Sequence, residues 1–451
     1  MFRKAENVLK KWKENSNKKA LLITGARQIG KTYLVRQFGK TYYENFIEIN
    51  FITTPTAVNI FSGDLNADTI IMNLTAFLGQ NLIPSKTLIF LDEIQECPNA
   101  RTAIKFLVED GRFDYIESGS LLGVNYKPVP SYPVGYEEIL QMYPMDFEEF
   151  CIANGIQSQT IEYLKKCYLE NQPTTDSIHK TMLDLFKYYI IVGGMPAVVQ
   201  AFVNSHNIGQ VISIQKDILA QYRQDISKYT VENKTKVNNI FDQIPAQLDD
   251  KNRRFKLATI DKKARLREYE DAFMWLQDAG VALSCYNLTE PKIPLKINEQ
   301  SRLFKLFMSD CGLLCAMGLE NVQFDILQNN MSVNMGSILE NVFAQQLKSN
   351  GFSLRYFNKR GVGELDFVIQ CGNQIIPVEI KSGKDYKAHK ALNNALNVTS
   401  WNLKKGIVFC MGNVEENEHV IYLPWYMVMF FKQMSLDNLK VDFNLFLDPN
   451  T

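Results

Sequence analysis

The sequence has no excess of charge of either sign, because 49 Lys and Arg residues offset 49 Asp and Glu residues among its 451 residues. A chain without an overall positive charge is not an obvious nucleic-acid binder, so any contact with DNA must come from a local patch. Residues 1–20 and 251–268 are locally basic and are the two candidates for that patch. The acidic segment 137–149 is expected to be a solvated surface.

Closely spaced metal-binding motifs are also missing. None of the eight cysteines forms a CxxC pair, and the four histidines are scattered. A structural zinc site needs several such ligands at short spacings, so we expect none. Scattered cysteines in a large chain are typical of reduced core thiols, which predicts a cytoplasmic location.

Long uninterrupted apolar runs are absent. The stretch 188–203 is broken by Gly193, Gly194 and Pro196, and the stretch 422–431 is far shorter than the ~20 residues that a membrane helix needs. Charges recur near the N-terminus, so we expect neither a signal peptide nor a membrane partner. In contrast, 46% hydrophobic and 22% charged residues exclude disorder over the whole length.

Strand-like and helical segments alternate through the first third of the chain. Strand signals occur at 20–24, 46–51, 87–91 and 115–117, with helical stretches between them. This alternation predicts an α/β fold with a parallel sheet. Helical segments dominate after residue 150, and segments 281–286 and 292–298 are expected to pair as a short hairpin. The last third has the predicted order αβββαβ, in which residues 364–371 are expected to form one strand.

The segment GARQIGKT follows the first strand and opens a helix, which is the context of a phosphate-binding loop. Its glycines let backbone N–H groups point at phosphate oxygens, and the helix N-terminus adds a partial positive charge. We expect Lys31 to reach the β- and γ-phosphates of ATP, and the Thr32 hydroxyl to ligate Mg²⁺. The predicted nucleotide-binding residues of this loop are Gly25, Ala26, Arg27, Gln28, Ile29, Gly30, Lys31 and Thr32.

Polar residues end the strands at 87–91 and 115–117. Asp92 and Glu93 follow the first of these strands, whose carboxyl end is expected to meet the phosphate loop. Asp92 would hold Mg²⁺ through water, and Glu93 would orient or deprotonate the attacking water. Ser118 is the preferred contact to the γ-phosphate or the lytic water, and Ser120 is the alternative.

A second set of carboxylates lies in the last third. Glu379 and Lys381 share one face of a strand, and a hairpin would bring Asp366 beside Glu379. Two carboxylates would then hold Mg²⁺, and Lys381 would activate a water or stabilise the reacting phosphate. Glu340, on the preceding helix, would complete the metal shell.

Together these segments resemble one group of bacterial and archaeal AAA-type ATPases whose C-terminal half is a domain of unknown function. The resemblance rests on GARQIGKT at 25–32, LDEIQ at 91–95, SGS at 118–120, YPMDFEEF at 143–150, GGMP at 193–196 and KLFMSDCGLL at 305–314. The Asp366 and Glu379-x-Lys381 pattern resembles the PD-(D/E)xK nuclease fold, although Leu365 stands where a proline is usual.

The resemblance implies four parts. They are a P-loop AAA core at 1–150, a helical lid at 151–235, a winged-helix-like segment at 236–330 and a restriction-endonuclease-like αβββαβ domain at 331–451. AAA ATPases usually complete their site with an arginine from the lid or from a neighbouring subunit, so the resemblance allows a homo-oligomer. Arg112 and Arg223 are both candidates for that arginine, and neither is assigned.

The leading hypothesis is an ATPase, dependent on ATP and Mg²⁺, that couples hydrolysis to a nuclease-like domain in contact with DNA. The alternative is a nucleotide-controlled interaction switch whose nuclease-like domain is catalytically inactive. A small-molecule phosphotransferase is a third reading. It fits less well with the acidic pair after the strand at 87–91 and with the lid-like helices.

Overall fold

The parallel sheet expected near the N-terminus is present. The computed structural model describes residues 1–119, 129–229, 234–250, 254–260, 262, 265–318, 322–327 and 335–433. Its first sheet has the strand order β2-β3-β4-β1-β5, and every neighbouring pair is parallel. The strands are β1 (Ala20–Thr24), β2 (Asn45–Asn50), β3 (Thr87–Asp92), β4 (Asp114–Ser118) and β5 (Glu137–Gln141). The prediction of a parallel α/β core is confirmed.

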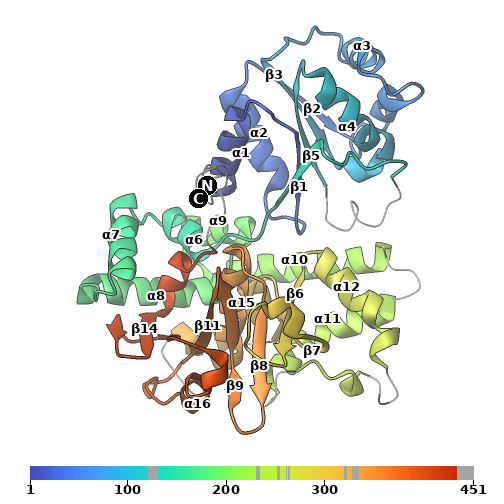
Figure 1. The fold of residues 1–451 in the computed structure, drawn as a ribbon. Coiled ribbons are helices and arrows are strands. Elements are labelled where there is room, and N and C mark those ends of the chain that lie inside the picture. The colour runs from blue at the N-terminus through green and yellow to red at the C-terminus, as the bar shows by residue number, and fades with distance from the viewer. Residues whose placement is uncertain are drawn as a thin grey trace, which may run out of the picture.

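Helices cover both faces of this sheet (Figure 1). They are α1 (Ala5–Glu14), α2 (Lys31–Tyr42), α3 (Ala67–Leu78) and α4 (Pro98–Asp110). Alternate residues of β1 point to opposite faces, so Leu21 packs in one core with α1 and α2, and Leu22 packs in another with α3 and α4. Every residue of β1 and β3 is buried, as is typical of central parallel strands.

A layer of helices follows, as the sequence predicts. The helices are α6 (Phe147–Ala153), α7 (Ser158–Leu169), α8 (Asp176–Val192), α9 (Pro196–Ser205), α10 (Ile208–Tyr229), α11 (Lys234–Asp249) and α12 (Glu270–Asp278). Figure 1 shows α9 and α10 between the first sheet and the remaining strands. Among the described residues, no helix is long and apolar enough to cross a membrane.

The second sheet has the order β7-β6-β8-β9, with β6 (Ala282–Leu288), β7 (Glu299–Met308), β8 (Arg355–Lys359) and β9 (Gly363–Leu365). The predicted pairing of 281–286 with 292–298 is wrong, because β6 pairs antiparallel with β7. Pro291 and Pro294 lack the N–H that a strand would donate, and residues Leu295–Asn298 form a 3₁₀ turn. Since β6 also pairs with β8, this sheet joins strands from both sides of the expected boundary at residue 330.

The third sheet has the order β10-β11-β12-β14-β13. Its strands are β10 (Phe367–Cys371), β11 (Gln374–Ile380), β12 (Gly406–Cys410), β13 (Glu415–Glu416) and β14 (Val420–Pro424). The expected single strand at 364–371 is split at Asp366, so β9 and β10 lie in different sheets. The expected order of helices and strands is present, but the strands are divided between two sheets. The accompanying helices are α13 (Cys311–Gly318), α14 (Val322–Leu327), α15 (Met335–Ser349) and α16 (Lys390–Leu396).

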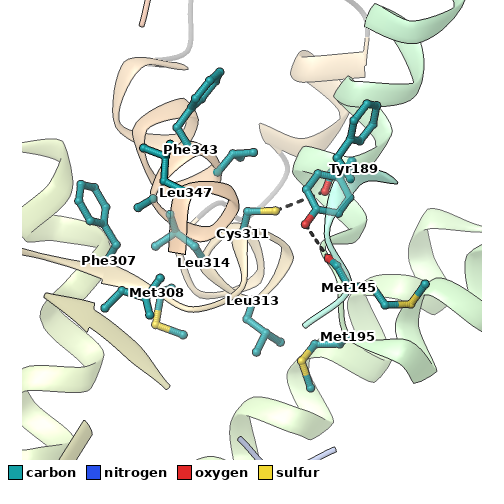
Figure 2. Close-up of a cluster of buried hydrophobic side chains, with 14 of the residues drawn as sticks. Met145, Tyr189, Met195, Phe307, Met308, Cys311, Leu313, Leu314, Phe343 and Leu347 are labelled. Carbon is teal, nitrogen blue, oxygen red and sulfur yellow. Dashed lines mark hydrogen bonds between the residues drawn. The ribbon is translucent and has the colours of Figure 1, made fainter. Parts of the chain in front are cut away.

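A buried junction joins segments that lie far apart in the sequence. Figure 2 shows Met145, Tyr189 and Cys311 in one apolar cluster. The Tyr189 hydroxyl donates to the Met145 carbonyl at 2.7 Å, and the Cys311 thiol donates to the Tyr189 carbonyl at 3.4 Å. Asp310 accepts a 2.6 Å hydrogen bond from the N–H of Gly194. Three of the family-like motifs therefore hold the helical layer against the C-terminal half of the chain.

Candidate nucleotide-binding site

The phosphate loop lies between the end of β1 and the start of α2. Its backbone has positive φ at Gly25 (142°), Gln28 (65°) and Gly30 (89°), which curls the chain back on itself. A Cβ atom at Gly25 would lie 2.4 Å from the carbonyl oxygen of Met142, so this position requires glycine. The loop thus sits at the carboxyl edge of a parallel sheet, where ligands bind in folds of this kind.

Asp92 is the centre of the polar site beside this loop. Asp92 is buried, with only 2% of its surface exposed. Its carboxylate accepts hydrogen bonds from the Thr32 hydroxyl at 3.1 Å and from the Asn50 amide at 2.9 Å. The Ser118 hydroxyl also donates to it. The structure therefore brings Thr32, Asp92 and Ser118 together at three strand and helix ends, while Ser120 lies outside the described residues.

Lys31 crosses the loop, and its ammonium donates to the carbonyl oxygens of Gly25 at 3.1 Å and Ala26 at 2.8 Å. Burial lowers the pKa of Lys31 to about 8, and the nearby carboxylates of Glu93 and Asp92 oppose part of that shift. Glu93 has a left-handed backbone (φ 56°) and its carboxylate accepts a hydrogen bond from the Gln95 amide. Lys31 and Glu93 therefore face the same polar site.

Helix α10 contacts the phosphate loop from the outside. The Tyr222 hydroxyl donates to the Arg27 carbonyl at 3.2 Å, and Asp225 forms an ion pair with the Arg27 side chain. The Gln28 side chain also bonds to Gln221. Residues 221, 222 and 225 lie on neighbouring turns of the helix, so one face of α10 meets two consecutive loop residues.

Residues near the N-terminus also contact the phosphate loop. The Arg3 guanidinium donates to the carbonyls of Ile29 at 2.8 Å and Tyr143 at 2.7 Å, and it forms an ion pair with Glu149 at 3.2 Å. Lys4 pairs with Asp146. The prediction of a solvated acidic segment is therefore wrong at its C-terminal end. There Asp146 and Glu149 are buried because they neutralise the cations that precede α1.

The two candidate arginines for completing the site lie in ion pairs on the surface. Arg112 bonds to Asp110 and Asp68, and Arg223 bonds to Asp242 at 2.8 Å. The choice between the two arginines stays open.

The carboxylates predicted in the last third are divided. The register of β10 against β11 pairs Phe367 with Val378, which brings Asp366 beside Glu379. The Asp366 carboxylate accepts from the backbone N–H of Ile380 at 2.8 Å, and Glu379 pairs with Lys381 at 3.2 Å. Burial, followed by the charge of Asp366, raises the pKa of Glu379 to about 8.

Glu340, predicted as the third metal ligand, instead pairs with Lys305 at 3.1 Å. Lys305 also pairs with Glu364 at 2.6 Å. Among the described residues, no group of three or more His, Cys, Asp or Glu side chains is arranged to hold a metal ion. Lys305, Glu364 and Asn50 were not predicted from the sequence, because their partners come from distant segments. Of the three, only Asn50 could have been predicted from the sequence, because it ends strand β2, which neighbours β3.

Three family models match the chain. Residues 17–151 match an AAA domain, and residues 183–323 and 335–427 match two domains of unknown function (DUF8612 and DUF4143). An uncharacterized protein of Methanocaldococcus jannaschii is 23% identical over 449 residues, which cover 92% of this chain and 85% of that protein.

Two solved structures have low structural similarity to this chain. A Walker-type ATPase of Pyrococcus abyssi has a TM-score of 0.41 at 13% identity, over 70% of this chain and 95% of that one. The Orc1 protein of Aeropyrum pernix in complex with DNA has a TM-score of 0.28 at 13% identity, over 73% of this chain and 91% of that one. The AAA-domain match at residues 17–151 spans the parallel sheet and its phosphate loop, so this part of the chain is similar to an AAA-type P-loop ATPase domain.

Proposed function

We propose that the chain binds ATP with Mg²⁺ at residues 25–32 and hydrolyses it. The observation that carries this proposal is the convergence of Thr32, Asn50 and Ser118 on the Asp92 carboxylate, directly beside the phosphate loop. Phosphate release from ATP by the purified chain, with Mg²⁺ or with EDTA, tests it. Absence of Mg²⁺-dependent hydrolysis would refute the assignment.

The residues present fit a magnesium ion. Thr32 and Asp92 offer a hydroxyl and a carboxylate whose oxygens lie 3.1 Å apart, and oxygen ligands of this kind suit Mg²⁺. When bound, the ion would neutralise negative charge on the phosphates. Lys31 and the N–H groups of the loop would bind the same phosphates, and Glu93 would orient the attacking water.

Nucleotide affinity should fall as pH rises above about 8, the pKa of Lys31 in the absence of nucleotide. Below that pH the ammonium is charged and attracts phosphate. Above it, binding must take up a proton, so the Kd of ATP should rise by up to about tenfold per pH unit. Binding of a fluorescent ATP analogue from about pH 6.5 to pH 9.5 measures this dependence. The Lys31→Arg variant stays charged and should give a flatter profile, whereas a flat wild-type profile would contradict the prediction.

The contact between α10 and the loop supports coupling of ATP binding to the rest of the chain. Any movement of Arg27 on nucleotide binding must break or carry along the ion pair with Asp225 and the hydrogen bond from Tyr222. At its other end α10 is fixed to the buried junction, since the Gln215 amide donates to the carbonyls of Ile191 and Val192. We propose that α10 passes the nucleotide state on to the C-terminal half.

Asp225→Asn should weaken ATP binding about two- to fivefold, which corresponds to roughly 0.5–1 kcal/mol for a partly exposed ion pair. It should also reduce the change in amide hydrogen exchange that ATP causes along α10. Asp242→Asn is the matched control, because it removes the ion pair of Arg223, which lies on another face of α10. Equal behaviour of the two variants would rule out a specific role for Asp225.

The second part of the proposal is a nuclease-like C-terminal domain that contacts DNA. Its support is the pairing of β10 with β11, which gathers Asp366, Glu379 and Lys381. Arg3 and Lys4 are held in ion pairs, so these two residues of the N-terminal basic stretch are not available for DNA contact. The other basic stretch, 251–268, lies partly outside the described residues. The alternative, a nucleotide-controlled switch with an inactive domain, is favoured by the ion pair of Glu340 with Lys305.

A further inference from the structure

A fully buried lysine lies within the carboxylate cluster of the C-terminal domain. Lys305 is on β7 and is 0% exposed. Its ammonium lies 3.1 Å from Glu340 Oε2 on α15 and 2.6 Å from Glu364 Oε1 on β9. The ring of Tyr356, on β8, lies beneath the same ammonium at 4.9 Å. Three elements of the second sheet and one helix therefore surround a single positive charge.

Each of the two carboxylates that meet Lys305 has one oxygen bound to the ammonium. The second oxygen of Glu364 accepts a 2.5 Å hydrogen bond from the Asn358 amide. A divalent cation would need these carboxylate oxygens free of ammonium, because both cations bind the same lone pairs and repel each other. A buried lysine also needs these carboxylates, since an unpaired charge in the protein interior is strongly disfavoured.

Lys305 is held in place by its strand. Residue Lys305 pairs with Cys285 of β6 in the middle of an antiparallel ladder, so its backbone is bonded into the sheet. Because the side chain is fully buried, it is not available to contact a substrate. The role left for Lys305 is that of an internal counter-ion.

The other carboxylates of the cluster do not replace Glu340. Asp366 accepts from the N–H of Ile380, and Glu379 pairs with Lys381. Glu364 is near enough to raise the pKa of Glu379, which places all of these groups in one charged network. Glu340 is paired with Lys305, and among the described residues no three His, Cys, Asp or Glu side chains are arranged to hold a metal ion, so a centre built on Glu340, Asp366 and Glu379 does not fit.

We propose that Lys305 is the resident cation of this cluster, and that it prevents Glu340 and Glu364 from binding a divalent metal. The C-terminal domain then keeps a nuclease-like fold without a metal-dependent cleavage centre, and Lys305 ties β7 to α15 and β9. The inference bears on the nuclease-like part of the proposed function and is independent of ATP hydrolysis.

Thermal unfolding of the full chain with Mn²⁺ or with EDTA tests this inference. We expect the wild type to have the same Tm in Mn²⁺ and in EDTA, except for a shift caused by Mn²⁺ binding at other sites. Such a shift is recognised because it is unchanged in Glu340→Gln and in Asp366→Asn. Lys305→Met should lower the Tm in EDTA, because Glu340 and Glu364 lose their counter-ion. Mn²⁺ should restore part of that loss by taking the place of the ammonium. Lys381→Met, which removes a partly exposed lysine of the same network, should lower the Tm less.

The double variant Lys305→Met/Glu340→Gln keeps the test decisive if Lys305→Met does not fold. It removes one charge of each sign, so its Tm in EDTA should lie above that of Lys305→Met and should not rise with Mn²⁺. A rise in wild-type Tm with Mn²⁺ that Glu340→Gln abolishes would overturn the proposal. Plasmid cleavage with Mn²⁺ that Asp366→Asn abolishes would overturn it as well. ATP hydrolysis measured on the same samples separates these outcomes from a failure of the phosphate-loop assignment.

Discussion

Lys31→Ala should abolish ATP hydrolysis and reduce ATP binding by at least about tenfold. The Lys31 ammonium is buried against the phosphate loop and donates hydrogen bonds to the carbonyl oxygens of Gly25 and Ala26. In the complex it would exchange these bonds for phosphate oxygens. Hydrogen bonds to charged groups contribute about 1.5–3 kcal/mol each, which corresponds to roughly 10- to 150-fold in affinity.

Equilibrium binding of a fluorescent ATP analogue and phosphate release measure the two effects separately. Lys40→Ala is the matched control, since Lys40 is an exposed lysine in the last turn of the same helix. We expect Lys40→Ala to behave as the wild type. Wild-type hydrolysis by Lys31→Ala would show that the phosphate loop is not the site of the reaction.

Glu93→Gln should retain ATP binding and lose turnover. The substitution keeps the size of the side chain and removes the carboxylate that would take a proton from the attacking water. Loss of a positioned general base typically costs about 100- to 10,000-fold in rate. The expected pattern is therefore a fall in kcat of this order with little change in the Kd of ATP.

Single-turnover hydrolysis and nucleotide binding on the same preparation measure this separation. Glu96→Gln is the control, because Glu96 lies in the short 3₁₀ turn Ile94–Glu96, directly after Glu93. An increase in the Kd of ATP with unchanged kcat would assign Glu93 a role in binding instead. Equal losses in the two variants would point to damage to the turn.

The site beside the phosphate loop was accessible to sequence analysis because its geometry is regular. Asp92 and Ser118 end two strands and Thr32 lies in the first turn of α2, and these element ends meet at one edge of a parallel sheet. Knowing the strands and their parallel direction is enough to bring such residues together. Asn50 belongs to the same edge, at the end of β2, and would have been found by extending this argument to every strand end.

The strands of the C-terminal half were harder to predict. The apolar pattern at 281–286 marked β6 correctly, but nothing local shows that its partner is β7 and not the nearer segment 292–298. The run 364–371 has the pattern of one strand, although it changes sheets at Asp366. Strand pairing depends on contacts between distant residues, which periodicity in one segment does not encode.

The sequence alone determined the phosphate loop, the strands and helices that flank it, and the residues at the strand ends. These features follow from local rules: glycine permits the curled backbone, and the alternation of apolar residues sets the elements. Tertiary structure decided which charges meet. Arg3 pairs with Glu149 across 146 positions, and Lys305 pairs with Glu340 and Glu364 across 35 and 59 positions. The equal numbers of acidic and basic residues did not show that these ions would be buried together, because burial and pairing depend on how the chain packs.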